Sequence, residues 1–93
     1  MKRIISIIGS TGSIGLSSLN IIQKNKNFQI NLLSANKNYR LILKQIKIYK
    51  PKYFLIRDHS VFLKVKKIKY RNTKIVNSFE SINLIKKNDI IIC

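Results

Sequence analysis

The 93-residue sequence has few of the residues on which disulfides, metal centres and acid–base chemistry depend. Its one cysteine, Cys93, excludes an intramolecular disulfide and a paired-cysteine metal or redox site. The three acids, Asp58, Glu80 and Asp89, are too scattered for a carboxylate metal cage or a general acid–base pair. The one histidine, His59, has no second imidazole near it and is expected at the surface or at a helix cap. No apolar run approaches the roughly 20 residues of a membrane-spanning helix, so we predict a cytoplasmic protein with no membrane partner.

The sequence has 19 basic residues and three acidic ones, and its formal net charge is +16. This charge is spread along the whole chain, whereas a nucleic-acid-binding arm usually concentrates it in one segment. Ile, Lys and Asn number 19, 15 and 10, and A/T-rich codons encode all three. Mutational drift in an A/T-rich genome therefore explains the charge about as well as a polyanionic partner would, and we expect no nucleic-acid partner. A small basic nucleic-acid-binding module remains the alternative.

Short β-branched runs alternate with helical patterns along the chain, which is typical of a parallel sheet with helices on its faces. Strands are predicted at 3–8, 29–34, 53–56, 73–76 and 90–93, and helices at 14–25, at 38–49, after an N-cap at Asp58 and after an N-cap at Ser78. The predicted fold class is α/β, a Rossmann-like parallel sheet of about five strands alternating with helices. Because the sequence ends inside an apolar strand, we expect this sheet to be incomplete at the C-terminus.

All three glycines fall in one window, GSTGSIG at residues 9–15, directly after the first predicted strand. A glycine-rich turn at this place is typical of dinucleotide-binding domains. Gly9 would allow a tight turn, Gly12 a close approach to a pyrophosphate, and Gly15 close packing of the helix on the sheet. Amide groups at the helix start would face the phosphates. Three hydroxyl groups are expected to donate to phosphate oxygens, those of Ser10, Thr11 and Ser13. The alternative is a tight turn that binds nothing.

The end of the second predicted strand is the second informative place. An NAD-binding domain usually has an acidic residue there, which holds the ribose 2′-hydroxyl. This chain has no acid before Asp58 and offers Asn36, Lys37 and Asn38 instead. A lysine between two amides suits a 2′-phosphate, which favours NADPH. The alternative for Lys37 is an ordinary surface lysine.

Together these segments resemble the start of the 1-deoxy-D-xylulose 5-phosphate reductoisomerase family. The string from Ile4 to Gly15 closely resembles that family's N-terminus. Residues 36–38 are similar to its Gly-Lys-Asn, and residues 51–53 are similar to its Pro-basic-Tyr before the third strand. The resemblance covers essentially the whole chain, but only the first part of a much longer enzyme. Looser glycine strings occur in other NADP-dependent reductases such as aspartate-semialdehyde dehydrogenase, which remains an alternative.

The resemblance implies an NADPH-dependent oxidoreductase of isoprenoid precursor biosynthesis by the methylerythritol phosphate route. The family rearranges the phosphosugar 1-deoxy-D-xylulose 5-phosphate and reduces the product to 2-C-methyl-D-erythritol 4-phosphate. For the full-length enzyme the resemblance also implies a divalent metal, Mg or Mn, and a homodimer. It assigns cofactor contacts near the pyrophosphate and at the adenosine phosphate end to seven residues: Thr11, Gly12, Ser13, Ile14, Asn36, Lys37 and Asn38.

Two departures from the family pattern limit what this chain is expected to do. Asn36 stands where the family has glycine, and asparagine is the least costly replacement where φ is positive. The family's metal-binding carboxylates, substrate-phosphate residues and catalytic loop have no counterpart here, so we name no catalytic residue and no metal ligand. We expect residues 1–93 to be the N-terminal part of an NADPH-binding domain, with the catalytic and C-terminal domains outside this chain. Alone, the chain is not expected to be catalytically competent, because nothing would hold the substrate against the nicotinamide.

Overall fold

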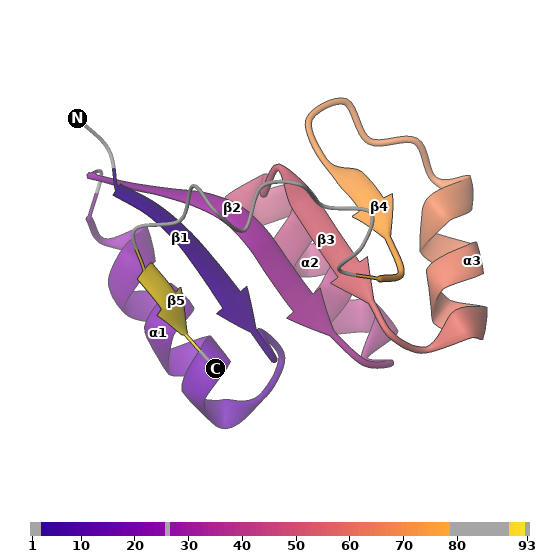
Figure 1. Cartoon of the computed structure of the whole chain (residues 1–93), viewed down its shortest axis with the longest axis horizontal. Helices are drawn as coiled ribbons and strands as arrows, with labels where there is room; N and C mark the ends of the chain where they lie inside the picture. The colour runs from indigo at the N-terminus through magenta and orange to yellow at the C-terminus, as the bar shows by residue number, and fades with distance from the viewer. Residues whose placement is uncertain (1–2, 26, 79–89, 93) are drawn as a thin grey trace.

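The computed structural model describes residues 3–25, 27–78 and 90–92, and in this part strands and helices alternate (Figure 1). The elements are β1 (Arg3–Ile8), α1 (Ser13–Gln23), β2 (Phe28–Ala35), α2 (Tyr39–Tyr49), β3 (Tyr53–Ile56), α3 (His59–Lys67), β4 (Lys74–Val76) and β5 (Ile90–Ile92). The predicted α/β class is confirmed, and the predicted elements of this part agree with the observed ones to within a few residues. The helix predicted after Ser78 falls on residues 79–89, which lie outside the described residues.

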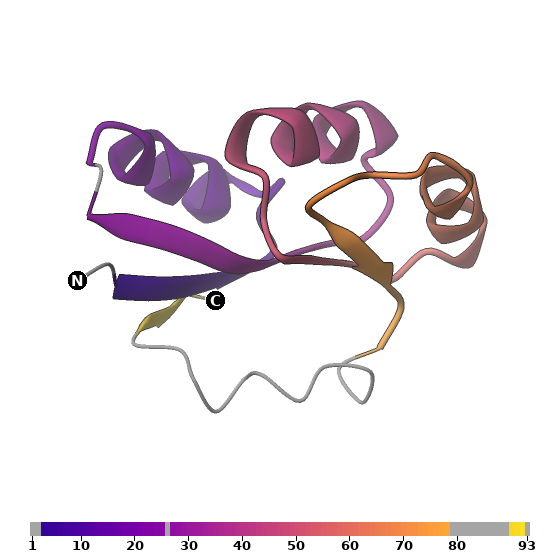
Figure 2. The same cartoon turned by 90° about the horizontal axis from the view of Figure 1, so that it is seen from above.

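The sheet has five strands in the order β4-β3-β2-β1-β5, and every pairing is parallel. The chain runs outward from β1 to β4 and then returns, so that β5 pairs with the other side of β1. This reversal creates a topological switch point at the carboxyl end of β1, where open α/β sheets usually bind their ligands. All three described helices cover the same face of the sheet (Figure 2).

The main core lies between the sheet and these helices. Apolar side chains of β1, β2 and β3 pack there against α1, α2 and α3, and the most deeply buried of them are Ile7, Leu33, Phe54, Ile56, Ile42 and Val65. A second, smaller cluster joins neighbouring strands through Leu32, Leu55 and Val76. Burial of this apolar surface is the main favourable term that holds the helices on the sheet.

An irregularity in β2 shifts the pairing between β1 and β2. Ile5 pairs with Ile30, but the next residue, Ser6, pairs with Leu32, so Asn31 is an extra residue in β2. Side chains normally alternate between the two faces of a strand. The extra residue shifts this alternation, and Ile30 and Leu33 therefore contribute to the same core cluster although they are three positions apart.

The N-termini of the described helices differ in how they are capped. The side chain of Asn38 caps α2 by accepting from the Leu41 amide at 3.3 Å, and that of Asp58 caps α3 by accepting from the Val61 amide at 3.0 Å. The predicted cap at Asp58 is confirmed. α1 begins after Gly12, receives no side-chain cap from the described residues, and has no acidic residue in its first turn. No helix among the described residues is long and apolar enough to cross a membrane.

Candidate cofactor-binding site

The two segments singled out in the sequence lie together at the carboxyl edge of the sheet. The Ser34 carbonyl of β2 accepts hydrogen bonds from the amides of Gly9 and Ser10, at 2.9 and 2.7 Å. Residues 36–38 follow β2 directly and precede α2. The glycine turn and the second segment therefore adjoin at the switch point of the sheet.

Two glycines of the turn are required by the geometry of the chain itself. Gly9 has φ +80°, a left-handed conformation that L side chains rarely adopt. A Cβ atom at Gly15 would lie 2.3 Å from the Gly9 carbonyl oxygen and 2.7 Å from the Ser10 Cα atom. Both contacts are far shorter than van der Waals distance, so α1 packs on the turn more closely than any side chain allows. The tight turn predicted at Gly9 is confirmed, and the close packing predicted at Gly15 is found against the turn rather than against the sheet.

The third glycine, Gly12, is not required by its neighbours. Its φ of −81° and ψ of 175° are open to any residue, and a Cβ atom there would make an ordinary contact of 3.5 Å with the Gly9 oxygen. Gly12 is exposed at the uncapped start of α1. A ligand at this position would explain the missing side chain.

The start of α1 presents its polar groups outward. Thr11 is half-buried, whereas Gly12, Ser13 and Ile14 are exposed, Ile14 by 67%. The first amide groups of a helix have no partner within the helix and carry the positive end of its dipole. With no capping side chain, these amides are directed to whatever lies beyond the helix end. Such an arrangement suits an anionic group such as a phosphate.

One predicted phosphate donor is not part of this surface. Ser10 is fully buried, and its Oγ atom donates to the Gln45 Oε1 atom of α2 at 2.7 Å. The expectation that the Ser10 hydroxyl contacts phosphate is therefore wrong. The cause is the turn itself, which directs Ser10 inward and the residues after it outward. The role of Gln45 was not predicted, although this glutamine lies at the inward spacing of the apolar residues Ile42 and Ile46.

The second segment lies at the surface. Asn36, Lys37 and Asn38 are all exposed, and the Asn36 carbonyl accepts from the Asp58 amide at 3.1 Å, which joins the segment to the end of β3. Asn36 has no positive φ, since Lys50 is the one non-glycine residue with positive φ in the described part of the chain. Its side chain therefore causes no backbone strain. The Asn38 oxygen is used for capping α2, which leaves its side-chain nitrogen to donate elsewhere.

Asp58 is the one carboxylate among the described residues. Hydrogen bonds from the Val61 amide and the Ser60 hydroxyl hold the pKa of Asp58 below its usual value of 3.8, and the positive charge of Lys37 lowers the pKa further. Asp58 is therefore ionised at neutral pH and committed to the start of α3. No group of three or more metal-ligating side chains occurs in the described ranges.

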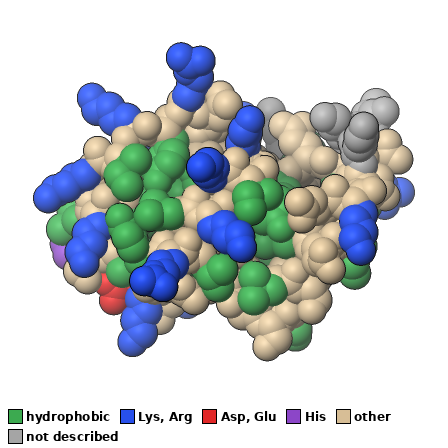
Figure 3. Space-filling view, turned by 180° about the vertical axis from the view of Figure 1, so that it is seen from behind, with side chains coloured by type: hydrophobic (Ala, Val, Ile, Leu, Met, Phe, Trp, Pro, Cys, Tyr) green, Lys and Arg blue, Asp and Glu red, His purple; other side chains and the backbone are tan. Residues whose placement is uncertain are grey.

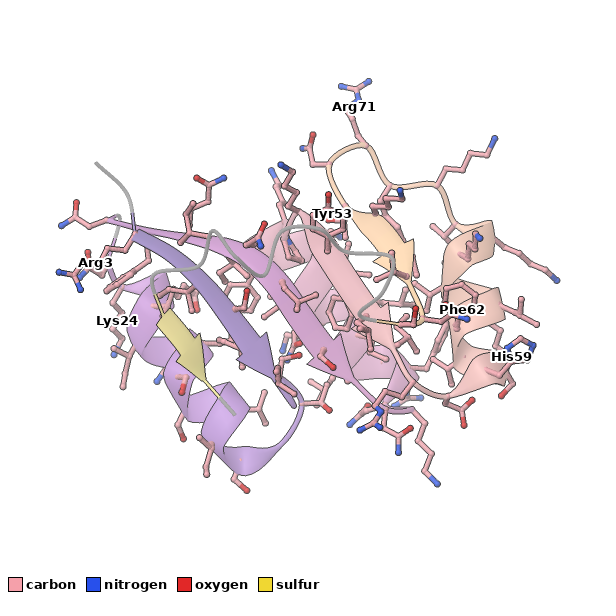
Figure 4. The ribbon with its side chains drawn as sticks, viewed as in Figure 1. Arg3, Lys24, Tyr53, His59, Phe62 and Arg71 are labelled. Carbon is pink, nitrogen blue, oxygen red and sulfur yellow. The ribbon has the colours of Figure 1, made fainter. Side chains whose placement is uncertain are left out.

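Three basic residues, by contrast, lie away from this edge. Figure 4 shows Arg3, Lys24 and Arg71 on the amino-end side of the sheet, opposite the glycine turn. His59 points outward from the start of α3, and its ring lies 6.4 Å from that of Phe62. The surface position predicted for His59 is confirmed.

Comparison with known proteins identifies relatives over nearly the whole chain. The sequence profile of the 1-deoxy-D-xylulose 5-phosphate reductoisomerase family matches residues 5–92. The reductoisomerase of Pelagibacter ubique is 46% identical over 87 residues, which cover 91% of this chain and 22% of that relative. The reductoisomerase of Buchnera aphidicola is 41% identical over 86 residues, which cover 88% of this chain and 21% of that relative.

Solved structures agree with this result. The reductoisomerase from Zymomonas mobilis in complex with NADPH matches with a TM-score of 0.78 and 26% identity, over 87% of this chain and 22% of that one. A reductoisomerase in complex with NADPH, fosmidomycin and magnesium matches with a TM-score of 0.77 at 24% identity, over 96% of this chain and 23% of that one, which supports the fold alone. The chain thus spans about a fifth of the length of the relatives it matches.

Proposed function

We propose, since this chain belongs to the 1-deoxy-D-xylulose 5-phosphate reductoisomerase family, that residues 9–15 and 36–38 bind the phosphate groups of NADPH. The observation that carries the proposal is the uncapped start of α1, which follows a glycine turn at the switch point of the sheet. In the described part of the chain, each of the other two helices satisfies one of its first amides with a side chain. The first amides of α1 have no such side chain among the described residues, which leaves them open to a ligand.

The pyrophosphate of NADPH fits the start of α1. The amides of Ser13 and Ile14 and the hydroxyls of Thr11 and Ser13 would donate to its oxygens, while Gly12 leaves room for the close approach. The exposed side chain of Ile14 would contact the adjoining apolar surface of the cofactor.

The 2′-phosphate of NADPH fits the second segment. Lys37 would supply the charge, and the side-chain amides of Asn36 and Asn38 would supply neutral donors. Residues 36–38 include no acidic side chain. In an NAD-binding domain such a side chain binds the ribose 2′-hydroxyl and would repel a 2′-phosphate.

For the whole protein we propose the activity of the family. This activity is the rearrangement of the phosphosugar 1-deoxy-D-xylulose 5-phosphate and the reduction of the product to 2-C-methyl-D-erythritol 4-phosphate, by a cytoplasmic homodimer. Bound NADPH supplies the hydride, and the residues of this chain hold and orient its phosphate end. The described residues do not fit the divalent metal of the family, because Asp58 is their one carboxylate and it caps α3. We therefore assign no metal ligand and no catalytic residue to this chain.

The test must separate specific recognition from general attraction. The formal net charge is +16, and Lys and Arg side chains are scattered over the helix-covered face (Figure 3). Any polyanion is therefore attracted to this protein to some extent. A control variant must remove one positive charge far from the site, and Lys24, exposed at the opposite edge, provides it (Figure 4).

The experiment compares NADPH and NADH binding to Lys37→Ala and Lys24→Ala by isothermal titration calorimetry. Lys37→Ala should weaken NADPH by about 1–2 kcal/mol, roughly 5- to 30-fold, and should leave NADH almost unchanged, because one charge-assisted contact to the 2′-phosphate is lost. Lys24→Ala should change both cofactors slightly. Equal losses of both cofactors in Lys37→Ala would refute the assignment of Lys37, and a wild-type chain that binds no NADPH would refute the proposed function.

A further inference from the structure

We propose that Gln45 is a positioning residue that holds the glycine turn of residues 9–15 in its cofactor-binding form without touching the cofactor. The proposal rests on the proposed function, since it concerns the same site. It assigns a role to a buried side chain of α2 that lies 35 residues from the turn in sequence.

Gln45 makes two hydrogen bonds to a single residue of the turn. Its Oε1 atom accepts from the Ser10 hydroxyl at 2.7 Å, and its Nε2 atom donates to the Ser10 carbonyl at 2.8 Å. Gln45 is 2% exposed and Ser10 is 0% exposed. We call this arrangement the Gln45–Ser10 pair. Hydrogen bonds shielded from water in this way fix geometry strongly, because breaking one leaves a buried polar group without a partner.

The pair completes the fixation of Ser10. The Ser10 amide donates to the Ser34 carbonyl at 2.7 Å, so the amide, carbonyl and hydroxyl of Ser10 are all bonded. Thr11, the first proposed contact to the pyrophosphate, is the next residue. The Gly12 amide closes the turn by donating to the Gly9 carbonyl at 3.1 Å. The turn is therefore held by β2 on one side and by α2 on the other.

The location of Gln45 argues against a role in packing alone. It lies on the inward face of α2 between Ile42 and Ile46, where an apolar side chain would contribute more to the core. A polar amide at this position is favourable because the turn offers one donor and one acceptor that match it. α2 also begins directly after Asn38, so one rigid helix sets both the glycine turn and the segment proposed for the 2′-phosphate.

The test uses the full chain with Gln45→Leu and, as a matched control, Gln23→Leu, which replaces an exposed glutamine at the far end of α1. NADPH, NADH and adenosine 2′-monophosphate are titrated into each variant. Gln45→Leu should weaken NADPH and NADH by the same factor, about tenfold or more, because both depend on the turn through their pyrophosphate. Adenosine 2′-monophosphate has no pyrophosphate, and its affinity should stay within about twofold of wild type. Gln23→Leu should leave all three affinities unchanged.

Two results with Gln45→Leu would overturn the proposal. One is unchanged NADPH binding, which would show that the turn keeps its form without the pair. The other is an equal loss of adenosine 2′-monophosphate, which would indicate a general structural role. A wild-type chain that binds adenosine 2′-monophosphate and NADPH equally weakly would overturn both this proposal and the proposed function.

A second variant covers the case in which Gln45→Leu does not fold. Gln45→Glu keeps the acceptor for the Ser10 hydroxyl but loses the donor to the Ser10 carbonyl while the new carboxyl group is ionised. When protonated, that carboxyl group donates and accepts as the amide does. The NADPH affinity of this variant relative to wild type should therefore recover as the pH falls from about 8 to about 5, since burial raises the pKa of a carboxyl group. A constant ratio across that range would refute the proposal.

Discussion

Replacing two neighbouring glycines by alanine should separate what the fold requires from what the ligand requires. In Gly15→Ala, the new methyl group would lie 2.3 Å from the Gly9 carbonyl oxygen and 2.7 Å from the Ser10 Cα atom. Both neighbours are backbone atoms, so α1 must move away from the turn and the core must adjust. Overpacking of this kind costs about 1–3 kcal/mol and sometimes more. For a small domain we expect a loss of at least about 2 kcal/mol in the free energy of unfolding and a fall in the midpoint temperature of about 10 °C.

Gly12→Ala should have the opposite profile. The new methyl group would lie 3.5 Å from the Gly9 oxygen, and the backbone angles of Gly12 suit alanine. The weaker N-cap preference of alanine and the lower entropy of its unfolded chain nearly cancel, so stability should change by less than about 0.5 kcal/mol. NADPH affinity should nevertheless fall about tenfold or more, because the methyl group occupies the space of the pyrophosphate.

The assay combines urea unfolding with NADPH titration for the wild type and both variants. A free energy of unfolding for Gly15→Ala equal to that of the wild type would contradict this prediction, since α1 could then move away from the turn at no cost. The reasoning is refuted equally if Gly12→Ala keeps its NADPH affinity, since the open face of Gly12 would then not be where the cofactor lies.

Two further predictions concern stability. Hydrogen bonds from Val61 and Ser60 lower the pKa of Asp58 below 3.8, so the contribution of Asp58 to stability is complete above that pH and is lost as the pH falls through the lowered pKa. In acid unfolding experiments, Asp58→Asn keeps the cap and should therefore lose less stability between about pH 5 and pH 2 than the wild type does. Identical pH profiles of the two proteins would contradict this assignment. Thr73 donates a buried hydrogen bond to the Pro51 carbonyl, so Thr73→Val should lower the free energy of unfolding by about 1–2 kcal/mol in urea without changing NADPH affinity, and a change in affinity would contradict its placement away from the cofactor edge.

The sequence predicts most of this fold because its local signals agree with one another. Apolar runs of strand length alternate with helical patterns, Asp58 caps α3 as its residue type suggests, and Pro51 follows the left-handed Lys50 that ends α2. The extra residue at Asn31 could not be predicted. Its effect on the alternation of β2 depends on pairing with β1, which is a contact between segments far apart in the chain.

The site was predicted less completely than the fold. The glycine spacing predicted the tight turn at Gly9 and the close packing at Gly15, because both are consequences of backbone geometry. The hydroxyl of Ser10 was placed wrongly, since residue type alone does not distinguish an inward serine from an outward one. A polar residue at an inward helical position was the signal for Gln45, but its partner lies 35 residues away and becomes visible only in three dimensions. The contacts assigned to residues 11–14 and 36–38 remain predictions.

The contrast between the helix starts gives the strongest physical reason to expect an anion at the glycine turn. α2 and α3 each satisfy an early amide through a side-chain oxygen, and Asp58 adds a full negative charge at α3. α1 has neither a capping oxygen nor an acid in its first turn, although capping is worth about 1 kcal/mol. The chain has a net charge of +16, and the one carboxylate among the described residues, Asp58, already caps α3 and cannot also cap α1. Binding of a pyrophosphate would therefore supply the missing cap, and NADPH should raise the stability of the folded chain in proportion to the logarithm of its concentration.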